Sequence, residues 1–393
     1  MKTVNFKAFA GVRNDVSLDR FGHADLSAGM NIDLDETGRV ARRAGVASVV
    51  AGVCHSLWGG DSVAYVVKDG VLNHVAIPAT LTAIKPIAGG RVRYTEINNT
   101  VYWTDGVESG HITNKVDNST LGIVPPGILS ATIISGTLRP GMYLVSMTYV
   151  RASGEESGAP RSTEVAVAEN EGIRLYSLPV STDPTVISKN IYVSAWDGET
   201  CYLAATLSNS DVIADIADQP SVGAALRTQF MVNAPAGQVI AYHGGRLYIA
   251  EGQYLWYSQP FEYGLFDARF GFIGMKAEIR TIAPNSNGLF VGTSDETYWL
   301  AGTDPTQFLS SLVSDYGTVL GTEATVPEFQ LGQQPTQGQK VCWYSAHGLC
   351  VGYDDGHVVN TTGGRYIHTA GREGASLFKV RGGTPQFLVT LEV

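Results

Sequence analysis

Short runs of alternating apolar and polar residues, each beside a glycine- or asparagine-containing turn, recur along the chain. Five segments share an apolar-aromatic strand with a polar turn, and four of them continue into a returning strand; they cover 59–72, 98–106, 244–258, 287–300 and 347–359. Alternation places one face of a strand in a core, and Asp-Gly or Glu-Gly supplies the positive φ angles of a tight hairpin turn. The segments lie about 40 residues apart, stretching to about 60 near the end, which is the spacing of four-stranded propeller blades. The pattern therefore predicts an all-β fold built as a β-propeller.

The repeat is interrupted in the middle of the chain. Breaker clusters at 125–127 and 233–237 enclose strand-like runs at 141–150, 164–167, 172–175 and 190–194. The enclosed length, about 110 residues, is close to that of one β-sandwich domain. We therefore expect three parts: an N-terminal arm with the first propeller blades in 1–124, an inserted immunoglobulin/fibronectin-like β-sandwich in 125–236, and the remaining blades in 237–393.

Composition and charge narrow the functional classes. The 45 glycines and the 16% of charged residues fit a β-rich protein with many turns. A net charge of −10 disfavours a general nucleic-acid binder, although it would suit a wall past which DNA slides without sticking. The first residues contain no signal-peptide core and no apolar run approaches membrane-spanning length. We expect a protein made in a cytoplasm and not exported by the usual route.

Candidate chemistry is sparse. Asp69, Asp105, Asp354 and Asp355 stand in hairpin turns, where a carboxylate caps local backbone groups. The histidines lack metal-binding spacing, although His347 and His357 could approach one another, and serine-nucleophile and phosphate-loop motifs are missing. Cys54, Cys201, Cys342 and Cys350 have no zinc spacing and are expected to be reduced, with Cys342 and Cys350 able to face each other across a hairpin. We predict no catalytic, cofactor or metal site.

Two segments are candidates for protein–protein interfaces. Arg39, Arg42 and Arg43 form the only dense basic cluster, which predicts a contact with a neighbouring subunit or, alternatively, with phosphate. The turn-rich segment 258–266 carries Phe261, Tyr263 and Phe266, which we interpret as a subunit or fibre contact, local packing being the alternative.

Two further patterns concern aromatic and polar side chains. Five tryptophans recur in or beside the repeated units and predict packing between blades rather than a sugar platform: Trp58, Trp103, Trp256, Trp299 and Trp343. The polar stretch 330–339 predicts a surface loop, or a gate if it lies at a channel tip.

Two resemblances organise these observations. The inserted segment resembles a fibronectin type III-like module in its strand Gly141–Val150, its Gly154-Glu155-Glu156-Ser157 motif and its strand 191–194. The flanking parts resemble tail nozzle or tail hub proteins of short-tailed bacteriophages, of the tail tubular protein B and packaged-DNA stabilisation type. The residues that carry this second resemblance are 30–46, 243–250, 257–260, 291–293, 316–317 and 343–348.

The phage resemblance implies a structural virion protein and not an enzyme. Family members form a homo-oligomeric ring, a hexamer, below the portal and the head-to-tail adaptor. The ring continues the channel that retains packaged double-stranded DNA and passes it at ejection without sequence-specific binding, and it docks tail fibres or spikes. The implied location is the virion tail, assembled in the bacterial host cytoplasm, with no cofactor and no membrane insertion.

Two alternatives stay open at this point. One is a carbohydrate-binding or carbohydrate-hydrolysing propeller with an accessory sandwich. The other is a host-receptor adhesin.

Overall fold

The structure is a computed structural model, which describes residues 8–35, 37–45, 47–60, 62–326, 338–366, 371–381 and 384–392. Apart from two short 3-10 helices, Leu18–Arg20 and Pro305–Gln307, the regular elements in these residues are strands. The all-β prediction is confirmed. Neither short helix approaches the length and apolarity of a membrane-spanning helix in this described part of the chain. The polar stretch at 330–339 lies largely outside the described residues.

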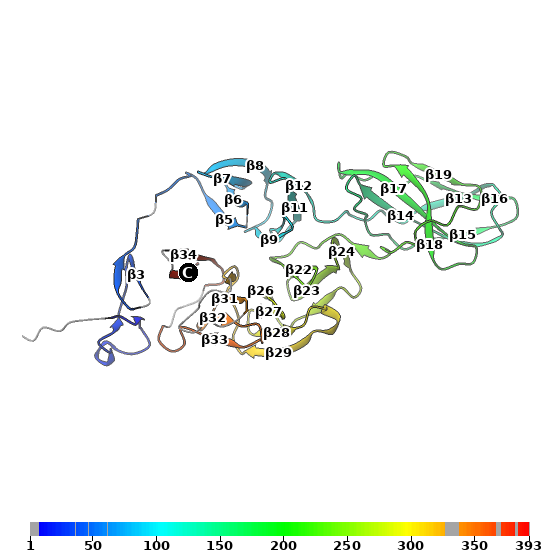
Figure 1. Ribbon diagram of the computed structural model, residues 1–393. Coiled ribbons are helices and arrows are strands. Elements are labelled where there is room, and N and C mark those ends of the chain that lie inside the picture. Colours follow the sequence, from blue (N-terminus) through cyan, green and yellow to red (C-terminus); the bar gives the residue numbers. More distant parts are fainter. Residues whose placement is uncertain are drawn as a thin grey trace, which may run out of the picture.

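The N-terminal arm contains four short strands. β1 (Gly11–Val12) pairs in parallel with β2 (Asp25–Leu26), and β3 (Ile32–Leu34) forms an antiparallel hairpin with β4 (Val40–Arg42). In Figure 1 this arm, in dark blue, lies beside the body of the molecule and not within it.

Five antiparallel sheets of four or more strands form the body. Their strands, in chain order, are β5 (Cys54–Gly59), β6 (Ala64–Lys68), β7 (Val71–Ala76) and β8 (Thr80–Pro86); β9 (Arg93–Ile97), β10 (Thr100–Thr104), β11 (Ser109–Thr113) and β12 (Asp117–Thr120); β21 (Val239–His243), β22 (Arg246–Glu251), β23 (Tyr254–Gln259) and β24 (Glu262–Asp267); β26 (Ile279–Asn285), β27 (Gly288–Thr293), β28 (Thr297–Ala301) and β29 (Leu309–Ser314); and β30 (Ala324–Val326), β31 (Lys340–Ser345), β32 (Gly348–Gly352) and β33 (Val358–Asn360). In the third sheet β20 (Met231–Val232) adds to β24, and β25 (Phe272–Gly274) pairs with β23.

Each of these sheets is a meander, because strands that follow one another along the chain pair with one another. In the first four sheets the repeated sequence units mark the second strand and, except in the second sheet, also the third strand. In the fifth sheet they mark the third and fourth strands, β32 and β33. The strand predictions at these positions are confirmed. The turns obey the expected chemistry, since Asp69 and Gly70 between β6 and β7 have φ angles of 50° and 77°.

From the second sheet onward, the first strands of successive sheets are neighbours in space. β9 contacts β21, β21 contacts β26, and β26 contacts β30 and β31. The chain ends in a two-stranded hairpin, β34 (Gly374–Arg381) with β35 (Thr384–Leu391), whose first strand contacts β30. The sheets thus follow one another around a common centre (Figure 1), an arrangement consistent with a β-propeller.

The middle segment leaves this body between β12 and β20. It forms one sheet from β13 (Ser130–Ser135), β16 (Glu171–Tyr176) and β19 (Ile213–Ile216), and another from β14 (Gly141–Arg151), β15 (Thr163–Val167), β17 (Val186–Ser194) and β18 (Cys201–Ser208). Residues of both sheets share one apolar core that includes Tyr143, Ile173 and Ile191. β20 lies within the segment predicted as inserted, but it pairs with β24 of the body.

Tryptophans fill the spaces between neighbouring sheets of the body. Trp58 and Trp103 belong to one cluster shared by the first two sheets, while Trp299 and Trp343 pack on Phe290 at ring-centroid distances of 4.5 and 5.2 Å. Packing between sheets is therefore confirmed for these four residues.

Candidate functional site

The basic cluster of the arm is exposed. Arg39 immediately precedes β4, Arg42 is its last residue and Arg43 follows it, and all three are exposed. The Arg43 guanidinium bonds the Asp33 carboxylate at 3.0 Å, while the carboxylate of Asp35 accepts the backbone N–H of Arg39 at 3.0 Å and so shapes the turn. The hairpin therefore presents cations on a strand whose residues are all exposed.

One anchor ties the arm to the body. The backbone N–H of Asn14 donates to the carbonyl of Arg365 at 3.0 Å, and the Arg365 guanidinium contacts the Asp25 carboxylate. The Gly22 N–H, together with Arg13 and Arg365, lowers the pKa of Asp25. This anchor holds β1 and β2, and it leaves the β3–β4 hairpin unpaired with any other described strand.

The aromatic segment 258–266 is divided between surface and core. Phe261 is 75% exposed, but Phe266 is fully buried in a cluster with Leu247 and Ile249, so its assignment as an interface residue is wrong. The physical reason is register, since Phe266 pairs with Ser258 on β23 and points inward.

Tyr263 is half-buried. Its ring makes edge contacts with Tyr102 at 5.4 Å and Tyr242 at 6.0 Å, so it serves local packing. Phe261 is the only one of the three candidates whose side chain is exposed enough to meet a partner directly.

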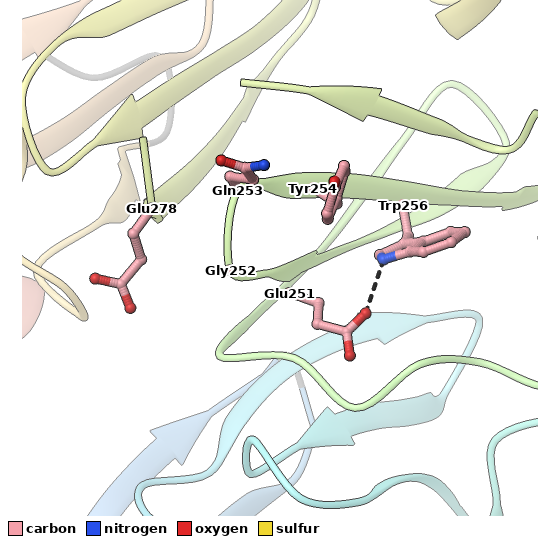
Figure 2. Close-up of a pocket in the computed structure, with 6 residues that line it drawn as sticks. All are labelled: Glu251, Gly252, Gln253, Tyr254, Trp256 and Glu278. Carbon is pink, nitrogen blue, oxygen red and sulfur yellow. Dashed lines mark hydrogen bonds between the residues drawn. The ribbon is translucent and has the colours of Figure 1, made fainter. Parts of the chain in front are cut away.

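A shallow hollow lies at the β22–β23 turn (Figure 2). It is lined by Glu251, Gly252, Gln253, Tyr254, Trp256 and Glu278. The indole N–H of Trp256 donates to Glu251 at 3.0 Å, and the rings of Tyr254 and Trp256 both contact Phe272, at 5.4 and 5.0 Å. Half-exposed rings can stack on a sugar face, and neighbouring carboxylates can accept hydrogen bonds from its hydroxyl groups. Trp256 is thus a recurring tryptophan that also lines a hollow.

The other sequence candidates have structural roles. The Asp105 carboxylate accepts backbone N–H groups of Gly89, Val107 and Glu108 at 2.7–2.9 Å, as expected for a turn residue. His347 and His357 lie at opposite ends of β32 and contact different tyrosines, Tyr316 and Tyr353.

The cysteines do not face one another. Cys342 pairs with Val351 and Cys350 with Trp343, so adjacent register positions put the two thiols on opposite faces of their sheet. All four cysteines are free thiols, and burial raises the pKa of Cys342 to about 12. Within the described residues no three His, Cys, Asp or Glu side chains are grouped to hold a metal ion.

A charged junction that sequence reasoning missed joins the last hairpin to the start of the second sheet. Arg91 and Arg93, just before and at the start of β9, bond the Glu373 carboxylate at 3.0 and 3.2 Å. Glu373 immediately precedes β34, so this junction links the last hairpin to the second sheet. No local signal could identify it, because the partners are 280 residues apart for the Arg93 pair.

No family model and no curated protein matches the chain. Among solved structures, it is similar to the AfRom2 CNH domain, at 7% identity over 86% of this chain and 94% of that one, with a TM-score of 0.27. It is also similar to a catalytically inactive virginiamycin B lyase from Staphylococcus aureus with quinupristin, at 11% identity over 85% and 90%, with a TM-score of 0.32. BBS1N in complex with ARL6DN matches at 11% identity over 84% and 89%, with a TM-score of 0.29. These are distant matches to β-propeller proteins, and the fold rests on the sheet order of the chain itself.

Proposed function

We propose that this chain is a structural subunit of a closed ring, of the kind that forms the tail nozzle or hub of a short-tailed bacteriophage. The observation that carries the proposal is the N-terminal arm, whose β3–β4 hairpin lies beside the body with exposed cations and unpaired strand edges. An unpaired strand edge can pair with a strand of another chain. In a cyclic ring each copy presents two different faces, and an extended arm supplies one of them.

The rest of the molecule supports the same role. We infer that the two-sheet middle segment is a fibronectin type III-like sandwich that projects from the propeller, where it could meet an adaptor, a fibre or a spike. The net charge of −10 would keep a DNA duplex from adhering to the walls of a channel. The work of such a subunit is mechanical, with no catalytic turnover.

The oligomeric state of the purified chain tests the proposal. We expect native mass spectrometry and negative-stain microscopy to show one closed ring, with the six copies that the resemblance implies. A chain that stays monomeric across the accessible concentration range would contradict the proposal.

The arm can be tested in the same assay. Replacing Arg39, Arg42 and Arg43 with Ala should weaken assembly about tenfold, equivalent to about 1.4 kcal/mol. The matched control replaces three exposed cations outside the arm, Arg161, Arg174 and Lys276, and should assemble normally. Equal assembly of both triple variants would show that the arginines of the arm do not contribute to ring formation.

Carbohydrate binding is the second candidate, favoured by the hollow at Tyr254 and Trp256. If it is correct, a glycan array will show binding that Tyr254→Ala abolishes and that the exposed-ring control Phe261→Ala retains. An array without reproducible binding would eliminate it.

A further inference from the structure

The last sheet of the body is short of strands. Each of the five preceding sheets has four or more strands, whereas β34 and β35 form a sheet of two. The hairpin nevertheless occupies the place of a full sheet in the series. β34 contacts β30 of the preceding sheet, and the Ser376 hydroxyl donates to the Glu323 carbonyl at 2.9 Å. A complete sheet at this place needs two more strands.

One face of this hairpin is packed and one edge is free. Phe378 and Phe387 pair across the hairpin and pack on the buried cluster of Val326, Cys342 and Val351. β34 is the strand nearest the preceding sheet, so new strands would add beyond β35, whose outer edge pairs with no described strand.

The free edge has little protection against further pairing, because among its residues only Pro385, the second, lacks a backbone N–H. β35 is eight residues long, Thr384–Leu391, and contains no charged residue. Natural sheet edges are normally short, charged or covered, because a long uncharged edge recruits other strands. Leu377, which pairs with Leu388 of β35, is also exposed. These features point to an extended strand as the ligand, bound through its main chain.

The same chain displays a matching element. The β3–β4 hairpin has two strands, the number that the last sheet lacks, and neither strand pairs with any other described element. The anchor at Arg365 holds the arm on the body of its own chain. Even with this anchor formed, the hairpin does not pair with β35 of the same chain. The partner that can fill the edge while leaving the anchor intact is a second copy.

We propose that the β3–β4 hairpin of one copy adds to the outer edge of β35 in the next copy and completes its last sheet with four strands. This inference rests on the proposed ring, because each copy then donates one hairpin and accepts another, as a head-to-tail cyclic assembly requires. Charge supports it: residues 1–53 hold seven basic and six acidic side chains, whereas the whole chain carries a net charge of −10. The nearly neutral arm of one copy is not repelled by the acidic body of the next copy, whereas two acidic bodies repel one another.

Mixed cysteine crosslinking tests the proposal. In a Cys54→Ser background, which removes the exposed native thiol, one protein carries Val40→Cys on β4 and a second, tagged for mass, carries Thr390→Cys on β35. Both substituted side chains are exposed, and a bis-maleimide with a flexible spacer tolerates small errors in register. We expect the heterodimeric crosslink in the mixture at a yield at least several-fold above that of either protein alone.

A matched control places the second cysteine on the middle segment, as Tyr176→Cys, where the side chain is also exposed and no crosslink to Val40→Cys is expected. Rings that assemble without the β4–β35 crosslink would overturn this inference and leave the ring intact. An intramolecular crosslink in the Val40→Cys/Thr390→Cys double variant, without the intermolecular product, would also overturn it, because the hairpin would then complete its own sheet. A monomer without any crosslink would contradict both the inference and the proposed function.

Discussion

Two arginine–aspartate pairs of the middle segment have similar geometry and different surroundings. Arg151 bonds Asp183 at 2.7 Å with side-chain exposures of 4% and 18%, whereas Arg174 bonds Asp215 at 2.6 Å with exposures of 43% and 41%. Arg151 also binds Glu155 at 2.6 Å and the carbonyl of Thr120 at 3.1 Å, so it joins the segment to the end of β12. At the scale of single residues, the difference in burial predicts that the Arg151–Asp183 pair contributes more to the free energy of unfolding than the Arg174–Asp215 pair.

We predict that Arg151→Ala lowers the free energy of unfolding by about 3 kcal/mol, because it leaves Asp183 without its cation in a largely desolvated place. Arg174→Ala, the matched control, should cost less than about 1 kcal/mol because water and salt screen that pair. Denaturant unfolding of both variants measures the difference. Equal losses would contradict the junction role of Arg151.

The same pair predicts a pH dependence. Although burial opposes it, hydrogen bonds from Arg151 and Thr185 lower the pKa of Asp183 below its ordinary value of 3.8. A carboxylate whose pKa is lower in the folded state stabilises the protein above its unfolded pKa and loses that contribution as the pH falls through the folded pKa. The stability difference between wild type and Arg151→Ala should therefore be constant near neutral pH and shrink below about pH 4. Unfolding midpoints at pH 7, 5 and 3 check this, and an increase at pH 3 would contradict it.

At the scale of elements, the backbone passes very close to β24 at the point where the middle segment leaves the body. Gly122 follows β12 with a φ of 77°, and a Cβ placed there would lie 2.1 Å from the carbonyl oxygen of Gly264 on β24. Its own carbonyl accepts a hydrogen bond from the Thr120 hydroxyl at 3.1 Å. A glycine is required here both by conformation and by space.

Gly122→Ala should therefore destabilise the protein more than Gly70→Ala. Gly70 has the same φ of 77° but open space around its Cβ position, so its substitution costs only the conformational strain of about 1–2 kcal/mol. The Gly122 variant should lose about 1–3 kcal/mol more, because backbone must shift to admit the methyl group. Thermal and denaturant unfolding measure both, and equal costs would show that the approach of β24 is unimportant.

At the scale of the whole molecule, Glu373 joins the last hairpin to the start of the second sheet. Its carboxylate bonds Arg91 and Arg93, and its backbone bridges to Leu320. The contact places the last hairpin against the segment that opens the second sheet. Since these groups are far apart in sequence, they restrain the large loop of chain between them.

We expect Glu373→Ala to loosen this closure. Hydrogen exchange measured by mass spectrometry should become faster in β34 and β9. The free energy of unfolding should fall by about 1–3 kcal/mol, because the guanidinium groups of Arg91 and Arg93 lose their carboxylate partner. Glu392→Ala is the control, since Glu392 is 67% exposed and lies 3.9 Å from Arg91. Unchanged exchange in both strands of the Glu373 variant would mean that the sheets close without this junction.

Much of the architecture can be predicted from local patterns. The first strand of each repeated unit alternates and ends near a turn with Gly, Asp or Asn, so it can be recognised within about ten residues. Outer strands are harder to recognise: β29, Leu309–Ser314, is mostly exposed and lacks alternation. The arm shows the same limit, because its strands are only two or three residues long.

The amino-acid sequence by itself determined an all-β chain of repeated strand–turn units with one interruption, because alternation and turn conformation are properties of neighbouring residues. Only the tertiary structure decided that Phe266 is buried while Phe261 is exposed, that Cys342 and Cys350 face away from each other, and that Arg93 meets Glu373. These outcomes depend on strand register and on the path of the whole chain. A one-residue shift in register reverses the face that a side chain occupies, and no local pattern records which distant segment will lie against it.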